Sequence, residues 1–174
     1  MSISFPPKCV TDTNFWIDMD RGQILIAVFS LPCELLAPDV IVGELREPDG
    51  RQLVEMGLRS RELPGKQVME VSRMAQLYRG PGRVDLFALA LAKAESAVLL
   101  TGDRPLREAA ENEGVVVQST LWVLDQMYSL GLAQPPVLAR SLKAMVEEGR
   151  RLPRNECERR IKKWSQLSKR RFGR

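Results

Sequence analysis

The chain has 174 residues, of which 44% are hydrophobic and 28% charged, and its formal net charge is +4. This length suits one sizeable core, or one domain with a helical appendage. No apolar run approaches the roughly 18 residues that a membrane span requires, so we expect a soluble protein without a membrane partner. The N-terminus lacks a basic start followed by an apolar segment, which argues against secretion.

The chain contains no histidine. This absence excludes Ser-His and Cys-His nucleophilic catalysis, histidine acid-base chemistry and nearly every common zinc or iron site. Cys9, Cys33 and Cys157 are odd in number and have no CxxC spacing, which argues against a disulfide framework and a thiolate zinc site. We therefore expect a cytoplasmic protein whose chemistry, if it is an enzyme, depends on carboxylates.

The basic residues are concentrated in the C-terminal segment. Residues 150–174 hold 11 Lys and Arg against two acidic residues, a net charge of +9, whereas residues 1–149 carry a net charge of −5. Such a segment is suited to contact phosphates or an acidic protein partner. The alternative is a solvated basic helix that docks on the core through Ile161, Trp164 and Leu167, which recur at helical spacing.

Short apolar runs alternate with helix-like stretches along the chain. In the first half of the chain, we expect a strand at 8–11, a helix at 13–30, a short apolar run at 34–37, helices at 42–46 and 53–57, a weak strand at 58–63 and a helix at 66–78. In the second half, we expect a helix at 84–95, a strand at 97–100, a helix at 107–114 and a strand at 115–118. Three further helices are expected at 120–130, 136–148 and 154–167. Strands separated by helices predict an α/β fold with a mostly parallel sheet and helices on both faces. Functional groups in such sheets gather at the carboxyl ends of the strands.

Several acidic residues fall at these predicted strand ends and helix starts. Asp12 follows the first strand, where it is either a helix N-cap or a functional carboxylate, and Asn14 has the same two interpretations. Glu44 lies in a helical region after Pro38, where a carboxylate in the first turns would also favour the helix dipole.

The other two acidic positions are Asp85 and Asp103. Asp85 heads a helix whose following residues on the same face are apolar, so its side chain should point in a buried direction, unless it caps the helix. Asp103 stands between a strand and a helix with Pro105 in the first turn, a good N-cap context, and Thr101 should share its side of the strand. Both again have a capping and a functional interpretation.

The capping interpretations do not explain why all four carboxylates fall on one rim of the predicted sheet. If they converge, their repulsion must either protonate some of them or require a cation. Oxygen ligands without nitrogen or sulfur select Mg²⁺ or Mn²⁺, which act on phosphoryl oxygens.

Four segments between about residues 9 and 124 resemble, in order, the landmarks of the PIN-domain ribonucleases, especially the small VapC-type toxins. They are VTDTNFWID with Asp12, VIVGELRE with Glu44, RVDLFALALA with Asp85, and LLTGDRPLR with Thr101 and Asp103. The resemblance implies a three-layer α/β/α sandwich over residues 1–131, followed by a helical extension over 132–174.

The same resemblance implies an activity. An acidic pocket with one or two Mg²⁺ or Mn²⁺ ions would hydrolyse RNA to 5′-phosphate and 3′-hydroxyl ends. Asp12 and Asp103 would be metal ligands, Asp85 a ligand or a holder of water, and Glu44 a ligand or a base, with Asn14 and Thr101 orienting them. The implied partners are RNA, an antitoxin protein and a second copy of the chain. The alternative is a catalytically silent PIN-like module that binds RNA or protein.

Overall fold

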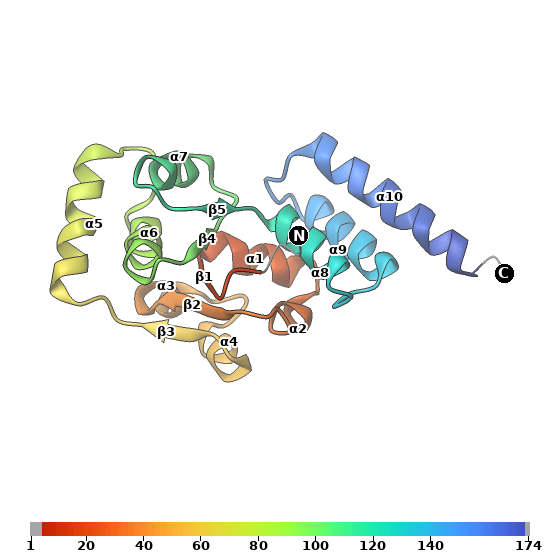
Figure 1. The fold of residues 1–174 in the computed structure, drawn as a ribbon, viewed down its shortest axis with the longest axis horizontal. Helices are drawn as coiled ribbons and strands as arrows, with labels where there is room; N and C mark the ends of the chain where they lie inside the picture. The colour runs from red at the N-terminus through yellow and green to blue at the C-terminus, as the bar shows by residue number, and fades with distance from the viewer. Residues whose placement is uncertain (1–4, 173–174) are drawn as a thin grey trace. The chain divides into compact units, whose positions relative to one another are not determined.

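The sheet is entirely parallel. A computed structural model describes residues 5–172, with side chains through residue 168. Its strands are β1 (Lys8–Thr11), β2 (Glu34–Pro38), β3 (Arg59–Arg61), β4 (Val98–Leu100) and β5 (Val117–Gln118), and they pair in the order β3-β2-β1-β4-β5 (Figure 1). The central strand β1 pairs through Cys9 with Leu35 of β2 and Val98 of β4. The predicted α/β/α class with a parallel sheet is therefore confirmed.

The helices follow the predicted alternation with one main difference. They are α1 (Thr13–Arg21), α2 (Leu25–Val28), α3 (Asp39–Glu44), α4 (Gly50–Met56), α5 (Gly65–Leu77), α6 (Arg83–Glu95), α7 (Arg104–Asn112), α8 (Thr120–Ser129), α9 (Pro135–Glu147) and α10 (Arg154–Phe172). The single helix predicted over 13–30 is divided, because Gln23 takes a left-handed φ of 54° directly after Gly22. A left-handed residue at this point ends a helix.

The central strands of the sheet carry buried apolar residues at consecutive positions, as expected for a parallel sheet covered on both faces. Val10, Leu36 and Leu99 on the three central strands have no exposed surface. Helix α6 packs against β1, β2 and β4, and α5 lies outside α6 (Figure 1). Ala88, Ala90 and Ala92 of α6 are buried, and their small side chains allow the helix to pack closely.

The chain divides into two compact units. The first contains the residues up to Trp16 together with Pro32–Ser119, and the second contains Ile17–Leu31 and the chain from Thr120 onward. This division concerns compactness, and the boundary at residue 131 stays a prediction. Within residues 5–172, no helix combines the length and the apolar character needed to cross a membrane.

One buried carboxylate links three segments of the second unit. The Asp18 side chain, 5% exposed, accepts a hydrogen bond from Thr120 Oγ1 at 2.8 Å and one from Arg150 Nε at 2.6 Å. Burial raises the pKa of Asp18, and the contacts with Arg150 and Thr120 oppose this effect. Trp164 of α10 is fully buried. The basic C-terminal segment is therefore a docked helix, and the side chains of its last basic residues, 169–174, lie outside the described residues.

A polar cluster ties the outer helices of the first unit together. The Glu113 carboxylate, whose side chain is 7% exposed, pairs with Arg73 of α5 and Lys93 of α6, each at 2.7 Å. It also accepts a hydrogen bond from the Tyr78 hydroxyl at 2.8 Å. Hydrogen bonding to Arg73, and then to Lys93 and Tyr78, lowers the pKa of Glu113 to about 2 against an opposing effect of burial.

This cluster predicts an acid-dependent loss of stability. Because the pKa of Glu113 is lower in the folded than in the unfolded state, its contribution is full above pH 4.5 and is lost as the pH falls towards about 2. The shift corresponds to about 3 kcal/mol. We expect Glu113→Gln to lower the free energy of unfolding in urea at pH 6 and to approach wild-type stability at pH 3. Glu111→Gln, at an exposed position of α7, is the control; equal pH profiles of the two variants would contradict the prediction.

Candidate functional site at the carboxyl edge of the sheet

The site is built around the end of the central strand. Asp12 directly follows β1 and is fully buried, and its backbone amide reaches the Leu100 carbonyl of β4 at 3.4 Å. Its Oδ1 accepts a hydrogen bond from the Phe15 amide at 2.7 Å and so caps α1. Its Oδ2 accepts a hydrogen bond from the Thr101 hydroxyl. Oδ1 of Asp12 therefore caps α1, as one interpretation of the sequence predicted. Oδ2 instead links Asp12 to Thr101, just beyond the neighbouring strand β4.

Thr101 connects the two strand ends. Its side chain is fully buried just beyond β4, and its backbone amide is held by the Gln118 carbonyl at 3.0 Å. The hydroxyl donates to Asp12 Oδ2 and accepts from the Asp103 backbone amide at 3.0 Å. One hydroxyl thus fixes the Asp12 carboxylate and the backbone that carries Asp103. The role of Thr101 in orienting the site carboxylates stays a prediction.

Asp103 is the N-cap of α7. Its Oδ2 accepts a hydrogen bond from the Leu106 amide at 2.9 Å, with Pro105 in the first turn of the helix, as the sequence predicts. The side chain is only partly buried. Capping fixes the rotamer of this carboxylate through one oxygen, so a cap and a functional group are compatible in the same residue.

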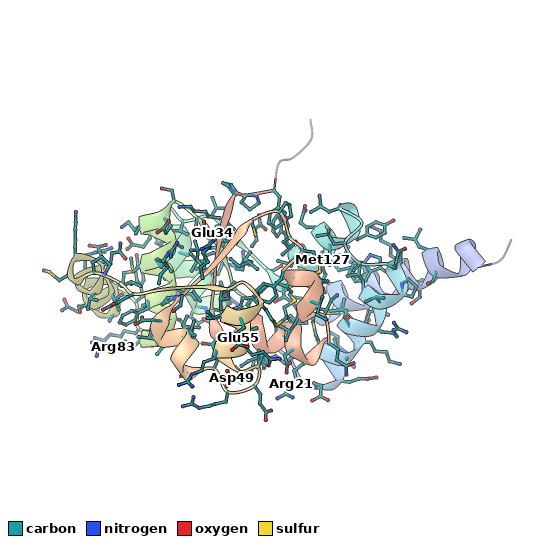
Figure 2. The ribbon with its side chains drawn as sticks, turned by 90° about the horizontal axis from the view of Figure 1, so that it is seen from below. Arg21, Glu34, Asp49, Glu55, Arg83 and Met127 are labelled. Carbon is teal, nitrogen blue, oxygen red and sulfur yellow. The ribbon has the colours of Figure 1, made fainter. Side chains whose placement is uncertain are left out.

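Asp85 lies three residues into the start of α6. Burial is the main cause that raises the pKa of Asp85, and repulsion from the Asp103 and Glu44 carboxylates raises it further. A hydrogen bond from the Gly82 backbone amide opposes the shift. Helix α6 thus carries its carboxylate towards those of α7 and α3. In Figure 2, Arg83 at the start of α6 and Glu34 at the start of β2 lie well apart, with Glu34 above and Arg83 at the lower left.

The expectation that Glu44 lies in the first turns of a helix was wrong. Glu44 is the last residue of α3, which begins at Asp39, and it is exposed. A carboxylate at the C-terminus of a helix faces the negative end of the dipole, so the expected benefit from the dipole does not exist. The position of Glu44 therefore has no explanation in helix stability, whereas its charge acts on Asp85.

Two residues of the rim need separate mention. Asn14 is half-buried in the first turn of α1, and Asp12, not Asn14, is the residue that caps this helix. Sequence reasoning missed Thr11, whose buried hydroxyl donates to the Leu36 carbonyl of β2 at 3.2 Å and accepts from Trp16 Nε1 at 2.7 Å. Its only signal was a polar residue at the end of a buried strand.

The side chains present are of the chemical type that suits a hard cation. In the part of the chain that the structure describes, no three acidic or cysteine side chains stand together closely enough to hold a metal ion. Mg²⁺ is, however, commonly held by one or two carboxylates and several waters. The charges that act on Asp85 are both negative, and a cation would relieve this repulsion. Oxygen is the donor type that Mg²⁺ and Mn²⁺ prefer.

An all-parallel α/β/α domain with carboxylates beyond the ends of its central strands defines a class of α/β proteins whose functional groups lie at that edge. A model of the family DUF3368, described as PIN domain, matches residues 8–166. The chain belongs to this PIN-domain family, whose members are typically nucleases. The matched range includes α8, α9 and most of α10.

Solved structures include distant likenesses. One is a PilT N-terminus domain protein from the hyperthermophilic archaeon Sulfolobus solfataricus P2, at 11% identity and a TM-score of 0.48, over 70% of this chain and 93% of that one. Another is VapBC2 from Rickettsia felis bound to a DNA fragment from their promoter, at 12% identity and a TM-score of 0.49, over 64% of this chain and 98% of that one. No curated protein matches the sequence of the chain.

Proposed function

We propose that the chain is a metal-dependent endoribonuclease that hydrolyses RNA phosphodiester bonds and acts as the toxin of a toxin–antitoxin pair. The observation that carries the proposal is the connected set at the carboxyl edge. The Thr101 hydroxyl joins Asp12 to the backbone of Asp103, and the charges of Asp103 and Glu44 act on Asp85. Membership of a family of nucleases supports hydrolysis as the type of reaction.

Each residue of the set has a separate task in this proposal. Asp12 and Asp103, fixed by their capping hydrogen bonds, would hold Mg²⁺ or Mn²⁺, and Asp85 would hold the ion or an ordered water. When bound, the ion polarises the phosphoryl oxygens of the substrate. Glu44, which is exposed, would be a further ligand or the base that takes the proton of the attacking water, and Asn14 and Thr101 would orient these side chains. No histidine is required for any of these tasks.

The partners follow from the same proposal. RNA is the substrate, and the resemblance to VapC-type toxins supports an antitoxin partner, a homodimer and a cytoplasmic location. Lys162 and Lys163 of α10 are exposed, whereas Arg160 of the same helix is engaged by Asp125 at 2.7 Å. We assign the exposed lysines, and not Arg160, to contact with RNA phosphates or an acidic partner.

One observation favours a second candidate, a silent PIN-like module that binds RNA without cutting it. The carboxylates within residues 5–172 do not already form a metal cage. Such a module would keep the fold and the basic surface and would lack the hydrolytic step.

Metal removal separates the two candidates. The purified chain is incubated with a mixed-sequence single-stranded RNA in Mn²⁺, in excess EDTA, and in EDTA followed by excess Mn²⁺, and the products are separated on a denaturing gel. We expect cleavage to 5′-phosphate ends in the first and third reactions and none in the second. Cleavage that persists in EDTA would contradict the proposed mechanism, and RNA that is bound but uncut in Mn²⁺ would favour the silent module.

A further inference from the structure

The glycine before α6 leaves space for a neighbouring side chain, and its backbone conformation does not itself call for glycine. Gly82 has φ −63° and ψ 150°, a conformation that any residue adopts. A Cβ at this position would lie 2.8 Å from Asp85 Oδ2. Real Cβ atoms essentially never come within 3.0 Å of another non-bonded heavy atom, so the carboxylate would have to shift. The Asp85 carboxylate therefore occupies the volume that a side chain at residue 82 would fill.

The same glycine also holds this carboxylate in place. The Gly82 backbone amide hydrogen-bonds the Asp85 side chain. Gly82 is the N-cap of α6 and Asp85 is the third helical residue, so this contact is the backward half of a capping box. The carboxylate is thus folded back over the first turn of the helix.

A second glycine lets this short loop approach the start of α7 closely. A Cβ at Gly80 would lie 2.8 Å from Pro105 Cβ, in the first turn of α7. At Gly80 the loop therefore lies against the start of α7, next to Asp103. Two residues later, at Gly82, the same loop contacts the Asp85 carboxylate. Pro105 is rigid, so it does not move aside as a long flexible side chain would.

From these contacts we infer that Gly80 and Gly82 are positioning residues that set the place of the Asp85 carboxylate relative to Asp103 for cation binding. The inference rests on the proposed function and deepens it, because it assigns the spacing of the site to the loop between α5 and α6. Gly80 lets the loop approach Pro105 of α7 closely, and Gly82 leaves room for the carboxylate and donates a hydrogen bond to it.

The test is a double-mutant cycle on Mn²⁺ affinity, measured by calorimetry on the full chain without RNA. We expect Gly82→Ala to weaken Mn²⁺ binding at least about tenfold, because the carboxylate must leave its place. Asp85→Asn should weaken binding by a similar factor. Because Gly82 acts through Asp85, the double variant should bind no more weakly than Asp85→Asn alone.

Gly65→Ala is the matched control, since a Cβ at that position meets nothing within 4 Å. Thermal melting without metal shows that each variant is folded. Equal Mn²⁺ affinity of Gly82→Ala and Gly65→Ala, or additive losses in the cycle, would overturn the positioning role while the metal site stands. A wild-type chain that binds no Mn²⁺ would overturn the proposed site and this inference together.

Discussion

Asp103→Asn and Asp12→Asn should each reduce RNA cleavage by at least about 100-fold and should abolish Mn²⁺ binding. Asparagine caps a helix about as well as aspartate, so the hydrogen bonds from Leu106 and Phe15 can be kept while the negative charge is lost. The exchange therefore separates the functional from the capping interpretation. Cleavage rates and calorimetric Mn²⁺ titrations of the pure variants measure the effect.

Asp49→Asn supplies the control for this pair. Asp49 caps α4 by accepting hydrogen bonds from the Arg51 and Gln52 amides and takes no part in the acidic set. We expect this variant to cleave RNA at the wild-type rate. If Asp103→Asn retained wild-type activity as well, Asp103 would be a helix cap and nothing more.

Thr101→Val should have the largest effect on stability among single substitutions at the site. Valine has nearly the same shape, but it removes the donor to the buried Asp12 carboxylate and the acceptor for the Asp103 amide. Leaving buried polar groups without partners costs about 3 kcal/mol in total. Urea unfolding at pH 7 measures this loss as a shift of the midpoint.

Thr101→Ser is the matching variant, because it keeps the hydroxyl and removes only a methyl group. Its expected cost is about 1 kcal/mol. Since serine preserves the link between Asp12 and Asp103, it should also retain most Mn²⁺ binding. Equal destabilisation by valine and serine would show that Thr101 contributes packing rather than the hydrogen bonds assigned to its hydroxyl.

The fold was predictable because its signals are local. Apolar runs such as 97–100 and the Asp103–Pro105 cap context depend on neighbouring residues, and each corresponds to an observed element. The long helix predicted over 13–30 was wrong at Gln23, because its periodicity continues through a residue that adopts a left-handed φ. Such a conformation is uncommon outside glycine, asparagine and aspartate, and the sequence carries no clear signal for it.

The site was predictable only as a set of candidates. The sequence placed the four carboxylates at strand ends and helix starts, but Glu44 proved to end its helix instead of beginning it. Helix α3 starts at Asp39, directly after Pro38, and it ends at Glu44, because the next residue, Leu45, has an extended backbone with ψ 126°. An argument from the helix dipole requires the exact residue at which the helix begins and ends. Hydrophobic periodicity in the sequence does not locate helix ends to within one residue.

By itself the sequence determined the chemistry that is available: carboxylate and hydroxyl oxygens, no histidine, and a basic C-terminal segment. The tertiary structure decided how these groups are used. Thr101 reaches Asp12 across 89 positions of the chain, Arg160 is neutralised by Asp125, and Gly82 makes room for Asp85. Residue types and local periodicity are properties of short segments, whereas these contacts exist only after parallel strands and their helices have packed, so no local pattern could specify them.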